Sequence, residues 1–119
     1  TGAVVVSGGV GINNDLHVGG DITAFASSDQ TLKENTVGIT SALYKVGLIT
    51  GYTYTWKEIS RYTGDDTGVI AQEVEALGLP GITTTRGDGT KGVRYERLVP
   101  LLIQAIKELE ARVKTLESS

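Results

Sequence analysis

A serine and a lysine five positions apart, Ser28 and Lys33, could act as a nucleophile and its general base. They lie in the stretch Ser-Ser-Asp-Gln-Thr-Leu-Lys-Glu-Asn, residues 27–35. A spacing of five matches neither the i+3 and i+4 face of a helix nor the alternate face of a strand, so the two side chains could meet only across a turn. Taken alone, such a pair is usually solvated surface. Whether this pair could act chemically therefore depends on the elements that would position it.

Composition excludes several kinds of site. The chain has 119 residues and no cysteine, so it offers no thiol nucleophile, disulfide or zinc-thiolate site. Its net charge of −3 argues against nucleic acid as the main partner. No apolar run approaches the roughly 20 residues that cross a bilayer, and the single histidine, His17, has no ligand partner nearby. We expect no metal, cofactor, nucleic-acid partner or membrane span.

Residues 1–25 repeat a short pattern of apolar runs broken by glycines. The stretch Val-Ser-Gly-Gly-Val-Gly-Ile at 6–12 is echoed eleven residues later by His-Val-Gly-Gly-Asp-Ile-Thr at 17–23. The runs at 3–6, 16–18 and 22–24 predict short β-strands. Each is too short to bury its apolar side unless it stacks on neighbouring units or on the same segment of other chains. The pattern predicts the β-structured end of a stalk, with a flexible linker as the alternative.

Residues 26–97 alternate short elements, which predicts a small mixed α/β domain and an α+β fold class for the chain. Ile39, Leu43 and Val46 have the spacing of a short amphipathic helix. Aromatic residues alternate along a strand at 52–56, and we expect them in the core rather than on a binding surface. The other expected elements are a turn at 64–68, a strand at 69–71, a helix at 72–77 and a hairpin with strands at 82–85 and 93–95.

Residues 98–119 predict a coiled-coil helix. Its seam has six apolar residues at alternating spacings of three and four: Val99, Leu102, Ile106, Leu109, Val113 and Leu116. Pro100 falls in the first turn, where proline is tolerated. A helix this short is marginal in water without packing, so we expect partners from other chains. β-branched residues at a with leucine at d suit two strands, and three are close in energy, so the seam does not set the number.

Five sequence blocks, taken in order, resemble one known family. They are Ser28–Asp29 with Leu-Lys-Glu-Asn at 32–35, Gly51–Tyr52 with Tyr54 and Trp56, Gly-Val-Ile-Ala-Gln-Glu-Val at 68–74, Val93 with Tyr95, and Leu98 leading to Ala-Ile-Lys-Glu-Leu at 105–109. The chain resembles the self-cleaving intramolecular chaperone domain at the carboxyl end of endosialidase-type bacteriophage tailspikes and tail fibres, to which a domain of the myelin regulatory factor is related. Thr31 stands where family members often carry arginine.

The resemblance implies a function. Three such domains assemble, hold three stalk segments in register while these wind together, and are then cut off. By resemblance the cut falls between Ser28 and Asp29, with Ser28 as the essential hydroxyl, Lys33 as its base and Asp29 as an assisting acid or a turn residue. The partners implied are two further copies of the chain, forming a homotrimer through the seam, and the chain's own upstream fibre stalk. The implied location is the virion, with synthesis in the cytoplasm of the bacterial host.

The sequence leaves two chemical questions open. A free lysine, with a pKa of about 10.4, is protonated at neutral pH, so a lysine base must be desolvated or lie near another cation. Attack by the Ser28 hydroxyl on its own carbonyl would close a strained four-membered ring, so a serine from a neighbouring chain or an activated water is chemically easier. The alternative to a single-turnover Ser-Lys peptidase without outside substrate is an uncleaved trimerisation cap or a receptor-contacting fibre tip.

Overall fold

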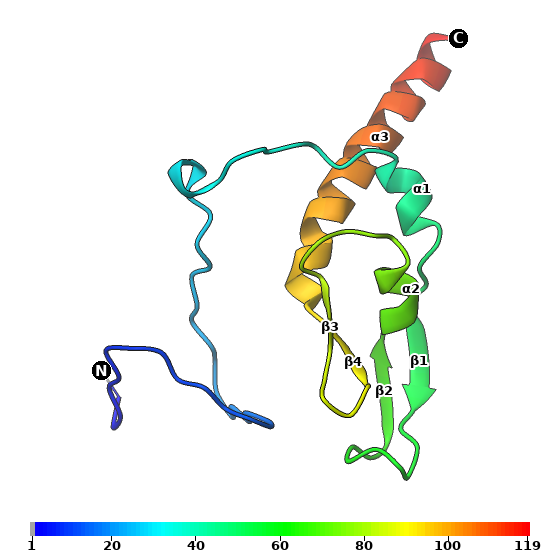
Figure 1. Cartoon of the computed structure of the whole chain (residues 1–119). Coiled ribbons are helices and arrows are strands. Elements are labelled where there is room, and N and C mark those ends of the chain that lie inside the picture. The colour runs from blue at the N-terminus through cyan, green and yellow to red at the C-terminus, as the bar shows by residue number, and fades with distance from the viewer. Residues whose placement is uncertain (1) are drawn as a thin grey trace. The chain divides into compact units, whose positions relative to one another are not determined.

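The computed structural model describes residues 2–119, which fall into two units by their internal contacts, residues 2–36 and 37–119 (Figure 1). The described part of the first unit holds one short 3-10 helix, η1 (Gln30–Leu32), and no strand. Its residues are exposed throughout. The strands expected at 3–6, 16–18 and 22–24 are therefore absent from the single chain. The physical reason is that runs of three or four residues have nothing to pack on here.

The second unit is a small α+β domain, which confirms the predicted fold class. In chain order it contains α1 (Ala42–Val46), β1 (Tyr52–Thr55), β2 (Asp65–Gly68), α2 (Ala71–Glu75), β3 (Thr83–Thr85), β4 (Lys91–Val93), the 3-10 helix η2 (Tyr95–Leu98) and α3 (Val99–Ser118). The strands form two separate antiparallel pairs, β1 with β2 and β3 with β4. The two predicted short helices and the long carboxyl-terminal helix are present. The predicted hairpin is present too, but its second strand lies at 91–93 rather than 93–95, because Tyr95 begins η2.

The partner of β1 is the segment that the sequence predicts to be a turn. Strand β2 pairs with β1 in the register Tyr52 with Gly68 and Thr55 with Asp65. The expected strand at 69–71 is wrong, because residues 69 and 70 are irregular and residue 71 begins α2. The connection turns at Gly64, whose φ of 87° favours glycine, and Thr55 Oγ1 then donates to Asp65 Oδ1 at 2.6 Å. This cross-strand hydrogen bond from Thr55 thus stabilises Asp65 within a strand.

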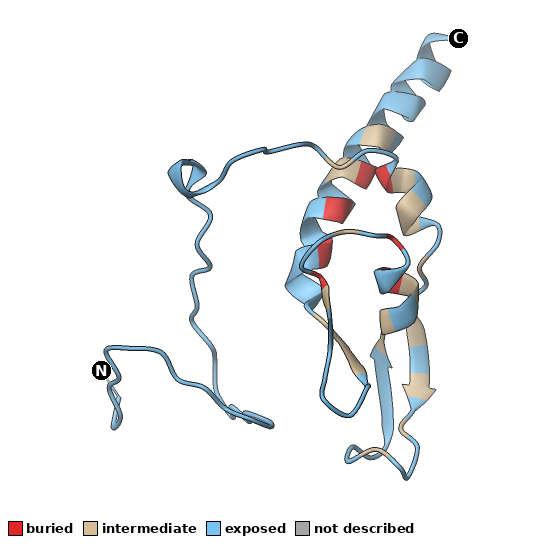
Figure 2. Cartoon of the chain, viewed as in Figure 1, coloured by how far each residue is buried: buried red, intermediate tan, exposed pale blue. Residues whose placement is uncertain are grey.

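The core is aliphatic and combines residues of α1, α2, η2 and α3 with the segment between α2 and β3 (Figure 2). Its buried residues are Ala42, Val74, Leu77, Ile82, Leu98, Leu101 and Ala105. The alternating aromatic residues of β1 are only half-buried and do not belong to this cluster. The expectation that they form the core is therefore wrong. They line a cavity beside β1 and β2 instead.

Two tyrosine hydroxyls leave no room for a side chain at Gly68. A Cβ there would collide with the Tyr95 hydroxyl and would lie 3.2 Å from the Tyr54 hydroxyl. Moving the Tyr95 hydroxyl away would break the hydrogen bond that it accepts from the Val69 N–H at 3.0 Å. We expect Gly68→Ala to destabilise the domain by about 1–3 kcal/mol through overpacking, measured by urea unfolding. Gly51→Ala is the control, because no atom lies within 4 Å of its added Cβ. Equal stability of the two variants would contradict this packing.

The amino-terminal end of helix α1 is capped by a residue that is distant in the sequence. Ser41 precedes the helix but makes no side-chain capping bond. Instead the Glu108 carboxylate on α3 accepts hydrogen bonds from the N–H groups of Ala42 and Leu43, both at 2.9 Å. These bonds, with that from Leu43 having the larger effect, hold the pKa of Glu108 below its ordinary value. The carboxylate thereby joins α1 to the middle of α3.

This cap predicts a pH dependence of stability. Because the pKa of Glu108 is lower in the folded chain, its contribution is fully present above the ordinary value of 4.5 and is lost as the pH falls through the lowered value. Glu108→Gln should therefore lower Tm at neutral pH, and its difference from the wild type should shrink as the pH falls below 4.5. Circular dichroism melts from acid to neutral pH measure this. Glu110→Gln, whose carboxylate pairs with Lys114 on the helix surface, is the control. A difference independent of pH would contradict the cap.

Candidate functional site

Ser28 and Lys33 meet across a single turn. Helix η1 lies between them, closed by hydrogen bonds from Leu32 N–H to the Asp29 carbonyl and from Lys33 N–H to the Gln30 carbonyl, both 3.1 Å. The turn brings the Lys33 ammonium nitrogen to the Ser28 hydroxyl, where Nζ donates to Oγ at 2.8 Å. This is the distance at which a lysine, once deprotonated, could take the hydroxyl proton.

Asp29 holds that turn closed. Its Oδ1 accepts from the Thr31 N–H at 2.9 Å and from the Thr31 hydroxyl at 2.8 Å. The backbone hydrogen bond first, and the hydroxyl bond second, lower the pKa of Asp29 from its ordinary value. A carboxyl held in its ionised form fits the turn role better than the acid role. Thr31, the residue that departs from the family pattern, supplies both donors.

The pair is exposed in the single chain. Ser28, Lys33 and every residue of η1 are open to solvent. Apolar side chains beside the pair are also uncovered, with Phe25 95% and Leu32 75% exposed. Among the described residues, Lys33 is the one group that hydrogen-bonds to the Ser28 side chain. One chain therefore brings a hydroxyl and an amine into contact, without the exclusion of water that a lysine base would need.

The six predicted seam residues lie along α3 with 44–74% of each exposed. A second face of α3, formed by Leu101 and Ala105, packs into the core of its own domain. Beyond Glu108 the helix has no buried residue, and Figure 2 shows this end projecting past α1. The helix therefore has one apolar face that its own domain covers and one that it leaves open.

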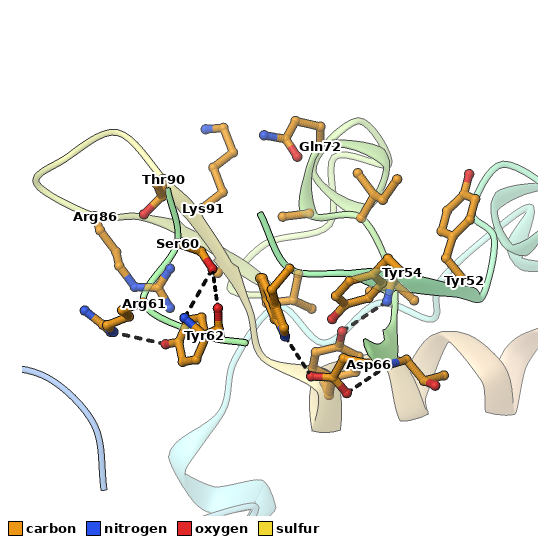
Figure 3. A pocket seen from close by; sticks show the side chains of 18 of the residues that line it. Tyr52, Tyr54, Ser60, Arg61, Tyr62, Asp66, Gln72, Arg86, Thr90 and Lys91 are labelled. Carbon is orange, nitrogen blue, oxygen red and sulfur yellow. Dashed lines mark hydrogen bonds between the residues drawn. The ribbon is translucent and has the colours of Figure 1, made fainter. Parts of the chain in front are cut away.

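Most of the aromatic residues line a cavity that the sequence did not predict. It has a volume of about 910 Å³ and lies beside β1, β2 and the β3–β4 hairpin (Figure 3). It is lined by all of the tyrosine and tryptophan residues except Tyr44. The Trp56 ring lies 5.1 Å from Tyr54 and 4.8 Å from Tyr62. The alternation of aromatic residues along β1 was the sequence signal available for this cavity, but Tyr62 and Tyr95 lie outside that alternating run.

Metal sites and membrane-spanning helices are both absent from residues 2–119. Within this range no three histidine, cysteine, aspartate or glutamate side chains gather as a metal site would require. No helix in the described range has the length and apolar character needed to cross a membrane.

Comparison with known proteins places the Ser-Lys turn at the edge of a family match. The model of the chaperone of endosialidase family matches residues 28–83, beginning at Ser28 itself. The chain is also similar to the long tail fiber protein Gp37 of Enterobacteria phage K3 and to that of Enterobacteria phage T2. Each is 32% identical over 117 residues, covering 89% of this chain but 9% and 8% of the two relatives.

The chain thus spans less than a tenth of the length of these relatives. The family match covers the Ser-Lys turn, α1, both strands of the first sheet and α2, which are the elements carrying the first three sequence blocks. Residues 28–83 of the chain thus match the chaperone of endosialidase family.

Proposed function

We propose that this chain is the trimerising intramolecular chaperone of a bacteriophage tail fibre and that it releases itself by cutting its own Ser28–Asp29 bond. The observation that carries the proposal is the 2.8 Å hydrogen bond between Lys33 Nζ and Ser28 Oγ across the η1 turn. Similarity to two long tail fiber proteins supports the fibre, and hence the virion, as the place of action. Synthesis in the cytoplasm of the bacterial host belongs to the same proposal.

Assembly is supported by the open face of α3. The seam from Val99 to Leu116 is apolar, regularly spaced and 44–74% exposed at each position, so association with α3 of two other copies would bury it. Three chains joined at one end have a high effective concentration of their upstream segments. The single chain leaves the apolar side chains of residues 2–25 exposed and without strands, and stalk segments held together in register could cover them.

Self-cleavage would follow from the same association. A lysine acts as a base only without its proton, and removal from water between chains favours the neutral amine. The uncovered side chains of Phe25 and Leu32 beside the pair would supply the apolar cover. Loss of the chaperone after folding leaves the stalk without its assembly template, so unfolding becomes kinetically difficult.

A structural cap is the second candidate. In that case the chain trimerises through α3 and stays uncut, as the tip of a fibre that contacts a receptor. The aromatic cavity of about 910 Å³ favours this candidate, because tyrosine and tryptophan side chains with hydrogen-bonding partners are typical of binding surfaces. The two candidates differ in whether the Ser28–Asp29 bond is cut.

We expect cleavage to wait for assembly, since the pair is fully exposed in one chain. In a dilution series of the wild-type protein, the rate of product formation should follow the fraction of assembled chains measured by native mass. Product should cease to form at concentrations where only monomers remain. Cleavage at full rate in verified monomers would contradict this dependence while leaving the roles of Ser28 and Lys33 standing.

A further inference from the structure

The hydrogen bond between Lys33 and Ser28 favours the Ser28 hydroxyl as the nucleophile. The Lys33 nitrogen donates to the serine oxygen at 2.8 Å, so a neutral Lys33 would have that hydroxyl within reach as a proton donor. An amine placed on a hydroxyl activates that oxygen for attack. For the Ser28–Asp29 bond, however, the serine oxygen of the same residue would have to close a four-membered ring.

We propose that the pair acts between chains, so that Ser28 of one copy attacks the Ser28–Asp29 bond of a neighbouring copy. This inference rests on the proposed self-cleavage and adds the direction of attack. The base and its hydroxyl come from one chain, as the hydrogen bond shows. The carbonyl comes from another chain, because the ring strain excludes the residue's own carbonyl.

The segment around the bond is suited to being bound by a neighbour. Residues 21–29 contain no helix or strand and are exposed throughout. At Asp29 the backbone is extended, with φ −65° and ψ 131°. On the other side of the bond, the hydrogen bonds from Thr31 to Asp29 fix the turn that follows. The bond thus joins an open, irregular segment to a fixed turn, and a second chain can approach it without local unfolding.

The proposed step balances in atoms and charge. Neutral Lys33 takes the proton of its own Ser28 hydroxyl, whose oxygen forms an ester bond with the Ser28 carbonyl carbon of the neighbour. The carbon–nitrogen bond to the neighbour's Asp29 breaks, and the proton passes from Lys33 to the new Asp29 amine. Water then hydrolyses the ester, which restores the attacking hydroxyl and leaves a carboxylate on the neighbour's Ser28, and the proton released in this step passes to the new Asp29 amine.

Mixed assemblies test the direction of attack. We would co-express the wild-type chain with a Ser28→Ala chain carrying a distinguishing tag, confirm mixed assemblies by native mass, and measure the products of each chain by denaturing mass spectrometry. In a closed ring each chain has one attacking neighbour. Up to about half of the Ser28→Ala chains should therefore be cut at the bond before Asp29, whereas Ser28→Ala chains alone should stay whole.

A second mixture tests whether the pair belongs to one chain. Ser28→Ala and Lys33→Ala chains together contain both groups but never on the same chain, so no product should form. Product in this mixture would overturn the pairing within one chain, and cutting confined to the wild-type chains of the first mixture would overturn attack between chains. Pieces of 27 and 92 residues would also overturn it, because they indicate five-membered attack on the Ser27 carbonyl of the same chain. A wild-type chain that is never cut, alone or mixed, would overturn the proposed self-cleavage as well.

Discussion

Ser28→Ala and Lys33→Ala chains should each remain whole under conditions in which the wild-type chain is cut. The first variant removes the attacking oxygen and the second removes the base that contacts it at 2.8 Å. Residues that act as a unit each account for most of the rate when removed, so we expect at least about a thousandfold slower cleavage in either variant. Both side chains are exposed and lie outside the core, so fold and assembly should be unchanged. Product fraction against time, by denaturing mass spectrometry, measures the effect.

Matched controls are available within the same chain. Ser27→Ala removes the neighbouring hydroxyl, for which no hydrogen bond is found among the described residues, and Lys57→Ala removes an exposed ammonium of the second unit. Both variants should be cut at close to the wild-type rate. Unchanged cleavage in Ser28→Ala or in Lys33→Ala would remove that residue from the mechanism.

Leu109→Asp should convert a three-chain assembly into single chains. The substitution places a carboxylate in the centre of the seam in every chain, and removing an ion from water without a partner costs several kcal/mol for each ion. Leu109 is half exposed in the single chain and makes no part of the core, so the domain itself should stay folded. Native mass measures the loss of assembly, and circular dichroism verifies the fold. Ile106→Asp, one turn away in the same seam, should have the same effect.

Lys107→Asp is the control for the seam. It introduces the same carboxylate on the same helix, but at an exposed position outside the seam, so assembly should be retained. The Leu109→Asp chain should also stop cutting itself although Ser28 and Lys33 are untouched. A wild-type chain that runs as a monomer at micromolar concentration would contradict the coiled-coil proposal.

The parts predicted well are those whose signal is local. A repeating spacing of three and four residues places α3, and alternation at 52–55 places β1, because the positions of side chains around a helix or along a strand follow directly from spacing. The meeting of Ser28 and Lys33 across a turn also follows from local geometry, since a separation of five residues leaves a turn as the available connection.

The parts predicted poorly depend on contacts between distant segments. Asp65 and Asp66 are typical turn residues, yet they form a strand because Thr55 and Trp56 donate hydrogen bonds to their carboxylates. Helix α1 is capped from Glu108, more than sixty residues away. The aromatic cavity combines residues of β1 with Tyr62 and Tyr95, which no single periodic pattern joins. The strands expected in residues 3–24 fail for a related reason, because such short runs have no distant segment to pair with in the single chain.

The most direct test of the proposed function is denaturing mass spectrometry of fresh and aged wild-type protein, with native mass measured on the same samples. Self-cleavage between Ser28 and Asp29 divides the 119 residues into pieces of 28 and 91. We expect these two masses to accumulate in samples whose native mass before cleavage corresponds to three chains. A full-length chain that persists for days in a verified three-chain assembly would contradict self-cleavage and favour the uncleaved cap.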